Sequence, residues 1–118
     1  EKKPKFAVIG GGSWATAIAK MLCENQDEIA WYMRSTYAVE HLKHQKHNPN
    51  YLSSVAFDTN KLKLTNDINE AVAYADFIIF VDKPIKTFYN IKKDTFFKEY
   101  DDSMLMSKLE SCSKIHVI

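Results

Sequence analysis

Three consecutive glycines near the N-terminus form the part of this sequence most able to do chemistry. Gly10, Gly11 and Gly12 are the only glycines in the chain, and with Ala15 they form the pattern G-x-G-x-x-A. In this pattern the first glycine permits a tight turn, the second lets the backbone approach a pyrophosphate, and the small third residue lets a helix pack closely on a strand. The free N–H groups and the positive dipole end of that helix would then face the phosphates. The pattern predicts a dinucleotide site on Gly10, Gly12 and Ala15.

Two other interpretations of the glycine run have to be weighed. A P-loop requires a Lys-Ser or Lys-Thr pair after the glycines, and here Ser13 and Trp14 follow instead. A structural turn without a ligand stays open. Dinucleotide binding is favoured because an apolar run precedes the turn, a helical pattern follows it, and a second apolar run comes after that helix.

The end of the second apolar run bears on the choice of dinucleotide. Domains that prefer NAD usually carry Asp or Glu about 20 residues past the glycines, where it accepts a hydrogen bond from the ribose 2′-hydroxyl. Here Met33 and Arg34 occupy that place. An arginine cannot accept such a bond, but it can pair with a 2′-phosphate or lie against the adenine. We predict that the cofactor is NADPH or NADH, with NADPH at least tolerated; the alternative is a solvated arginine at the end of a strand.

The elements that must position these residues alternate along the chain. Four apolar runs typical of buried strands lie at residues 5–10, 28–33, 61–65 and 77–81. Three helical segments lie between them, at residues 13–25, from Ser35 or Thr36 to about 46, and at 67–75, where Asp67 and Glu70 resemble a capping box. This order predicts an α/β fold: an incomplete Rossmann-type parallel sheet of about five strands, with helices on both faces.

The last third of the sequence is less regular. A short helix could begin at Pro84, a second helix could run from Asp102 to about Cys112, and Lys114 to Ile118 resembles a fifth strand. The 118 residues have the length of one domain and no linker divides them, so we predict a single domain over 1–118. If no helix covers the terminal strand, its unpaired edge favours self-association, which light scattering would detect.

The composition excludes several classes of function. The chain is 46% hydrophobic and 26% charged, as in folded soluble domains, and its net charge of +1 gives no field that favours nucleic acid or an anionic membrane. No run approaches the roughly 20 apolar residues that span a bilayer. Two cysteines, Cys23 and Cys112, are too few for a disulfide framework, so we expect reduced thiols in a cytoplasmic protein.

Three histidines in and after the second helical segment could suggest a metal site. His41 and His47 are six positions apart, which on a helix turns their side chains about 120° from one another, so we expect His41, His44 and His47 not to converge. No cysteine or carboxylate stands at a recognisable ligand spacing beside them. The sequence therefore predicts no metal site.

Four segments together carry the pattern of a known enzyme family. They read FAVIGGGSWATA at 6–17, WYMR at 31–34, HNPNYL at 47–52 and ADFIIF at 75–80. In these segments the chain resembles the N-terminus of bacterial NAD(P)-dependent glycerol-3-phosphate dehydrogenase, and the asparagine-proline-x-tyrosine-leucine segment is more distinctive than the glycine turn. The resemblance covers residues 5 to about 81.

The resemblance implies a cytoplasmic enzyme that reduces dihydroxyacetone phosphate to sn-glycerol 3-phosphate for phospholipid synthesis. It implies that Ser13, Trp14 and Arg34 contact the nicotinamide dinucleotide beside Gly10 and Gly12. Hydride would pass from the nicotinamide to the ketone carbon, and the family's lysines would polarise the carbonyl and assist proton transfer.

Beyond Val81 the family pattern is expected to fail. Asp82 and Lys83 stand where the family has a small and an aliphatic residue before proline, and the family's first active-site lysine belongs to a lysine-glycine pair just after the fifth strand. The helical substrate domain, with the second lysine, is also expected to be absent. We therefore predict no catalytic residue in this chain and no turnover by the chain alone, as in a truncated product or a diverged module.

Two alternative functions remain at this point. One is another hydroxyacid dehydrogenase on the same fold, against which residues 48–52 speak. The other is a non-catalytic module that binds a dinucleotide or a partner.

Overall fold

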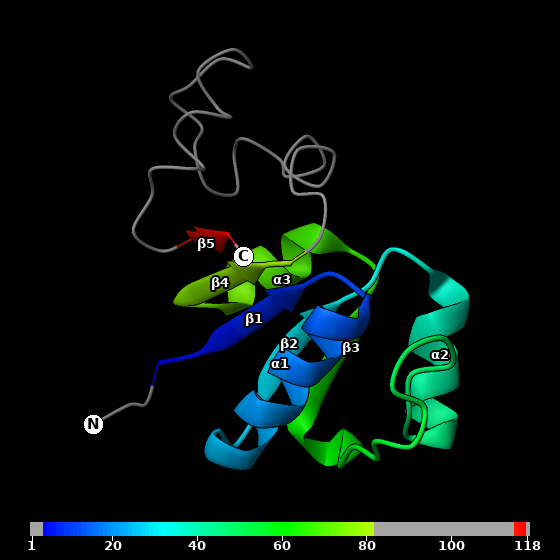
Figure 1. The fold of residues 1–118 in the computed structure, drawn as a ribbon. Coiled ribbons are helices and arrows are strands. Elements are labelled where there is room, and N and C mark those ends of the chain that lie inside the picture. The colour runs from blue at the N-terminus through cyan, green and yellow to red at the C-terminus, as the bar shows by residue number, and fades with distance from the viewer. Residues whose placement is uncertain (1–3, 82–114, 118) are drawn as a thin grey trace.

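The structure of the protein is a computed structural model, which describes residues 4–81 and 115–117 (Figure 1). The described elements follow one another as β1 Phe6–Ile9, α1 Ser13–Asn25, β2 Ile29–Tyr32, α2 Thr36–Gln45, a 3-10 turn Thr59–Lys61, β3 Leu62–Thr65, α3 Ile68–Tyr74, β4 Phe77–Phe80 and β5 Ile115–Val117. The strands and helices predicted between residues 5 and 81 are confirmed, and α1 has the predicted bounds. The helices expected at Pro84 and at 102–112 lie outside the described residues.

All five strands are parallel, in the order β3-β2-β1-β4-β5. The chain starts at the central strand β1, moves outward through β2 to β3, and returns to the other side of β1 for β4. In sheets of this kind ligands bind beyond the carboxyl ends of the strands, at the point where the direction of winding reverses. The glycine turn follows β1 at that point. The strand order and the parallel pairing confirm the predicted Rossmann-type sheet and its fifth strand.

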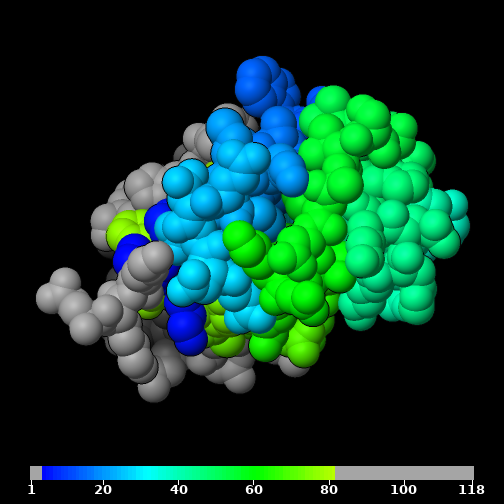
Figure 2. Space-filling model, turned by 90° about the horizontal axis from the view of Figure 1, so that it is seen from below, coloured from blue at the N-terminus to red at the C-terminus, as the bar shows by residue number. Residues whose placement is uncertain are grey.

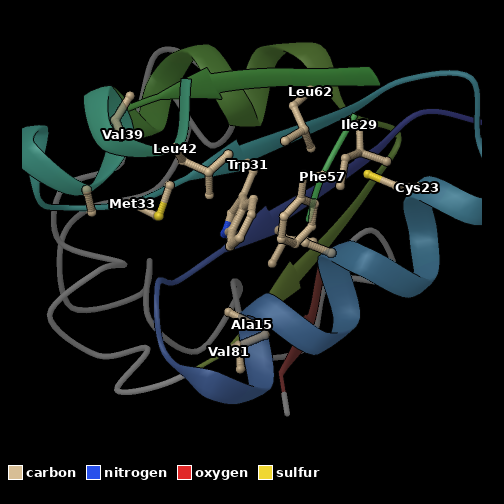
Figure 3. Close-up of a cluster of buried hydrophobic side chains, with 13 residues drawn as sticks. Ala15, Cys23, Ile29, Trp31, Met33, Val39, Leu42, Phe57, Leu62 and Val81 are labelled. Atoms are coloured by element: carbon tan, nitrogen blue, oxygen red, sulfur yellow. The ribbon is translucent and has the colours of Figure 1, made fainter. Parts of the chain in front are cut away.

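Helices cover both faces of the sheet, as predicted. Alternate side chains of a strand point to opposite faces, and in β1 the side chains of Ala7 and Ile9 pack with α3 on one face. On the other face Val8 packs under α1, α2 and the loop that carries Phe57 (Figure 3). Trp31 of β2 lies in the middle of this second core, with its indole beside the ring of Phe57 at 5.2 Å between centroids.

The helix starts show which predicted caps form. The Ser35 hydroxyl accepts from the Ala38 N–H at 3.1 Å, so Ser35, and not Thr36, caps α2. Asp67 caps α3 by accepting from the Asn69 N–H at 3.0 Å.

The reciprocal half of the predicted capping box is wrong. The Glu70 carboxylate accepts from the Thr65 hydroxyl instead of the Asp67 N–H, and the Asp67 N–H donates to the same hydroxyl at 2.9 Å. The hydroxyl of Thr65, the last residue of β3, lies between the two groups and bonds to both.

Two further observations concern the cysteine Cys23 and the possibility of a membrane-spanning helix. Cys23 is a buried free thiol, and burial raises its pKa, which favours the protonated form. Among the residues that the structure describes, no helix is long and apolar enough to cross a membrane.

Candidate functional site

Gly10 forms the bend at which the chain leaves the sheet. Its N–H donates to the Tyr32 carbonyl at 3.0 Å, and its φ is +138°, a conformation that residues with a Cβ rarely adopt. A Cβ built at Gly10 would lie 2.4 Å from the carbonyl oxygen of Val81, at the end of β4. Only glycine fits there, so the tight turn predicted for this residue is confirmed.

The other two glycines have different surroundings. A Cβ at Gly11 would approach Met33 Cγ to 3.2 Å, whereas a Cβ at Gly12 would meet nothing within 4 Å. Gly12 is the N-cap of α1, with an extended φ of −82° and ψ of −170°, so its own backbone does not require glycine either. No neighbour in the described structure explains this residue. A ligand that approaches the backbone closely would explain it.

The N-terminus of α1 has free hydrogen-bond donors beside this open space. Gly12 provides no side-chain cap, and within residues 4–81 and 115–117 the N–H groups of Ser13, Trp14 and Ala15 have no acceptor. The partial positive charge of a helix start adds to these donors. Donors, dipole and the absence of a Cβ together fit an anionic group such as a pyrophosphate.

The three residues after the glycines divide between surface and core. Ser13 is exposed and Trp14 is 72% exposed, so both are accessible to a ligand above the turn. Ala15 is fully buried in the core between α1 and the sheet (Figure 3). The close packing of helix on strand predicted for Ala15 is therefore confirmed.

Arg34 lies two residues beyond β2, at the same carboxyl edge of the sheet, and is exposed. Burial raises the pKa of the Tyr32 hydroxyl at the end of β2, and the positive charge of Arg34 acts against that rise. Among the described residues Arg34 has no ion-pair partner. Its charge is thus available to an anionic or aromatic group on the ligand.

Asn48 is a site residue whose contacts sequence reasoning missed. It lies in the loop after α2, is 1% exposed, and its Nδ2 donates to the Gly11 carbonyl at 3.2 Å and to Thr16 Oγ1 at 3.0 Å. The sequence marks it only as part of a family segment. The available signal was the Asn-Pro-Asn turn, in which an asparagine side chain commonly bonds to the backbone ahead of it.

Comparison with known proteins identifies the family. Residues 5–100 match the family described as the N-terminus of NAD-dependent glycerol-3-phosphate dehydrogenase. The chain belongs to this family. It is 35% identical over 77 residues to glycerol-3-phosphate dehydrogenase (NAD(P)+) of Limosilactobacillus reuteri, which covers 65% of this chain and 22% of that protein. It is 32% identical over 104 residues to the enzyme of that name from Staphylococcus epidermidis, which covers 88% of this chain and 29% of that protein.

A solved structure supports the same assignment. Glycerol-3-phosphate dehydrogenase from Coxiella burnetii superposes with a TM-score of 0.60 at 25% identity, over 67% of this chain and 24% of that one. The chain thus spans about a quarter of the length of the glycerol-3-phosphate dehydrogenases that it matches. The family match also extends to residue 100, so the end of the resemblance predicted at Val81 is too early.

In this member of the glycerol-3-phosphate dehydrogenase family, one step of the histidine prediction is wrong: the side chains of His41 and His47 do not point away from one another. The rings of His41 and His47 lie edge to face, 4.8 Å apart between centroids. Helix α2 ends at Gln45, and Lys46 takes a left-handed conformation (φ 64°), which turns the chain back. The helical angle between the two positions therefore does not apply. His44 points elsewhere, to the carboxylate of Glu40 at 3.6 Å.

Proposed function

We propose that this chain is the part of a glycerol-3-phosphate dehydrogenase that binds NADPH or NADH, with the cofactor's pyrophosphate over the glycine turn. The observation that carries the proposal is the open space at Gly12, beside the uncapped start of α1. In the whole enzyme the activity would be the interconversion of dihydroxyacetone phosphate and sn-glycerol 3-phosphate. When bound, the reduced nicotinamide supplies the hydride for that reaction.

Each proposed site residue has a distinct physical task. Gly10 directs the chain out of the sheet, Gly12 leaves room for the phosphates, and the N–H groups of the first turn of α1 donate to them. Ala15 keeps α1 close to β1, so that the helix start stays at the carboxyl edge. Ser13 and Trp14 offer a hydroxyl and an aromatic face at the exposed side of the turn.

Arg34 is proposed to bind the adenosine end of the cofactor. The ribose 2′ position of a dinucleotide bound over the turn falls near the end of the second strand. A free guanidinium there favours the 2′-phosphate of NADPH, which a carboxylate at the same place would repel. Its planar face can also stack on the adenine of either cofactor.

Titration of the chain with NADPH and with NADH tests the proposal. We expect saturable binding of NADPH, no weaker than that of NADH, seen as quenching of the exposed Trp14. In the variant Gly12→Ser a side chain fills the open space, and we expect affinity to fall at least about tenfold, a loss of about 1.4 kcal/mol. Serine is a favoured N-cap, so the thermal stability of this variant should be equal or higher.

The outcomes of this titration are separable. Binding of neither cofactor would contradict the proposed function. Binding of NADH with none of NADPH would contradict the role of Arg34 alone. Unchanged affinity in a folded Gly12→Ser protein would mean that the phosphates do not lie over the turn.

We also propose that this polypeptide, tested alone, does not turn over substrate. Hydride transfer needs a ketone held at the nicotinamide and a group that donates a proton to its oxygen. The chain matches only about a quarter of the length of the related enzymes. Most residues of those enzymes therefore have no counterpart in the matched segment. Mixed with NADPH and dihydroxyacetone phosphate, it should leave the cofactor absorbance unchanged; a steady decline that depends on the chain would refute this proposal.

Three expectations from the sequence stay predictions: a cytoplasmic location, a role of the product in phospholipid synthesis, and self-association through the terminal strand. In the described structure β5 pairs only with β4 and forms one edge of the sheet. A non-catalytic dinucleotide-binding module remains the alternative function. It would be favoured if the longest natural form of this chain bound the cofactor and showed no reductase activity.

A further inference from the structure

The side chain of Asn48 forms four hydrogen bonds. Its amide nitrogen has two hydrogens and its oxygen two lone pairs. The nitrogen donates to the Gly11 carbonyl and to Thr16 Oγ1, and the oxygen accepts from the N–H of Asn50 at 2.9 Å and of Tyr51 at 3.2 Å. All four positions are thus filled in a residue that is 1% exposed.

These four bonds join two separate loops. The two bonds that the Asn48 oxygen accepts, the acceptor side, stabilise the loop after α2, in which Asn48 itself lies. The two bonds that the Asn48 nitrogen donates form the donor side, and one of them joins the loop to the glycine turn, 37 positions earlier in the sequence. The same loop is tied to α1 further along, where Lys20 Nζ donates to the Ala56 carbonyl at 2.7 Å. In Figure 2 the green segment that leads toward β3 lies directly against the blue surface of α1.

The donor side fixes the orientation of one peptide plane. A trans peptide is planar, with its C=O and N–H pointing in opposite directions. Because the Gly11 carbonyl points at Asn48, the N–H of Gly12, on the same peptide, points away from Asn48. A peptide between two glycines rotates easily, since no Cβ restricts either neighbour. Without the Asn48 bond the same peptide could present its carbonyl oxygen to the ligand.

Thr16 extends this control to the next peptide. Its hydroxyl accepts from Asn48 and donates to the Gly12 carbonyl at 2.7 Å, while its N–H donates to the same carbonyl at 3.0 Å. The Gly12 carbonyl is thereby held along the helix, and the N–H of Ser13 points out beyond its start. Asn48 and Thr16 together therefore fix the two successive peptide planes that carry the N–H groups of Gly12 and Ser13.

We infer that Asn48 is a positioning residue that holds the glycine turn in the conformation that binds phosphate. It touches no ligand and acts through the Gly11–Gly12 peptide and through Thr16. The inference rests on the proposed function, because it assigns Asn48 to the same site. It predicts that removing the amide harms cofactor affinity beyond what its effect on stability explains.

The first test needs no cofactor. The chain has three glycines, so protein labelled with a heavy nitrogen isotope in glycine gives at most three backbone amide signals in a nuclear magnetic resonance spectrum. We expect single, sharp signals for Gly11 and Gly12 in the wild type. In Asn48→Ala these two signals should broaden or double, because the peptide between them samples two orientations. Unchanged signals in the folded variant would overturn the inference.

The second test measures affinity against a control of similar stability. Val72 belongs to α3 and is buried against the opposite face of the sheet, so Val72→Ala should lower stability without touching the turn. At a temperature where both variants are fully folded, Asn48→Ala should bind NADPH at least about tenfold more weakly and Val72→Ala like the wild type. Equal affinity in both variants would overturn the inference and leave the proposed function intact. Absence of binding in the wild type would overturn both.

Thr16→Val keeps the test decisive if Asn48→Ala does not fold. Valine has nearly the shape of threonine but lacks the hydroxyl that links Asn48 to the Gly12 carbonyl. We expect weaker cofactor binding in Thr16→Val and near wild-type binding in the matched control Thr16→Ser, which keeps the hydroxyl. Equal affinities in these two variants would contradict the proposed role of the network.

Discussion

Replacing Gly10 with alanine is expected to destabilise the fold by about 4 kcal/mol, the sum of two independent costs. The first is conformational: φ at Gly10 is +138°, and a strained backbone of this kind costs about 1–3 kcal/mol in a residue with a Cβ. The second is steric. The new Cβ would lie 2.4 Å from the Val81 carbonyl oxygen, a backbone atom that cannot swing aside, and overpacking of this kind costs about 1–3 kcal/mol. Small domains are stable by only about 5–15 kcal/mol in total.

Urea unfolding of the wild type, Gly10→Ala and Gly12→Ala measures this effect. Gly12→Ala is the matched control, because its Cβ meets nothing within 4 Å and its φ of −82° suits alanine. The loss of a good N-cap residue should cost it about 1 kcal/mol or less. If Gly10→Ala unfolds at the same urea concentration as Gly12→Ala, the turn does not have the conformation described here. A Gly10→Ala protein that is unfolded without urea agrees with the prediction.

The glycine turn also shows how far sequence reasoning reaches. Local periodicity and turn chemistry predicted α1 with its bounds, the tight bend at Gly10 and the packing of Ala15, because each depends on near neighbours in the chain. The order of strands and helices predicted the parallel sheet, since few ways exist to connect such elements. The open space at Gly12 supports the task proposed for it, which is to let a ligand approach the backbone.

The residues that sequence reasoning missed act over long distances. Asn48 lies in a loop that has no periodic pattern, and its side chain donates a hydrogen bond to the Gly11 carbonyl. Nothing in the local sequence predicts which carbonyl it reaches. His41 and His47 meet because Lys46 takes a left-handed conformation, which the helical-wheel argument did not include. In both cases the path of the backbone after α2 decides the contact, and an irregular path is what sequence patterns describe least well.

Trp31→Phe is expected to destabilise the fold by about 3 kcal/mol, because Trp31 joins the core to the glycine turn. Its indole is fully buried on β2, packs against Phe57, and donates from Nε1 to the Gly10 carbonyl at 2.7 Å (Figure 3). Phenylalanine keeps the aromatic packing but leaves that carbonyl without a donor among the described residues, which costs about 1–3 kcal/mol. The smaller ring also leaves a cavity in a closely packed core, which adds to the loss.

Trp14→Phe is the matched control, since the chain has two tryptophans and Trp14 is 72% exposed. The same chemical change there should alter stability by no more than about 0.5 kcal/mol. Each variant leaves one tryptophan as its own fluorescent reporter, buried in Trp14→Phe and exposed in Trp31→Phe, so urea unfolding can be followed in both. Equal unfolding midpoints would mean that the bond to Gly10 contributes nothing. A midpoint lowered only in Trp31→Phe would show that the buried indole stabilises the fold through its packing and its bond to Gly10, because both variants lose an indole and only one loses a buried one.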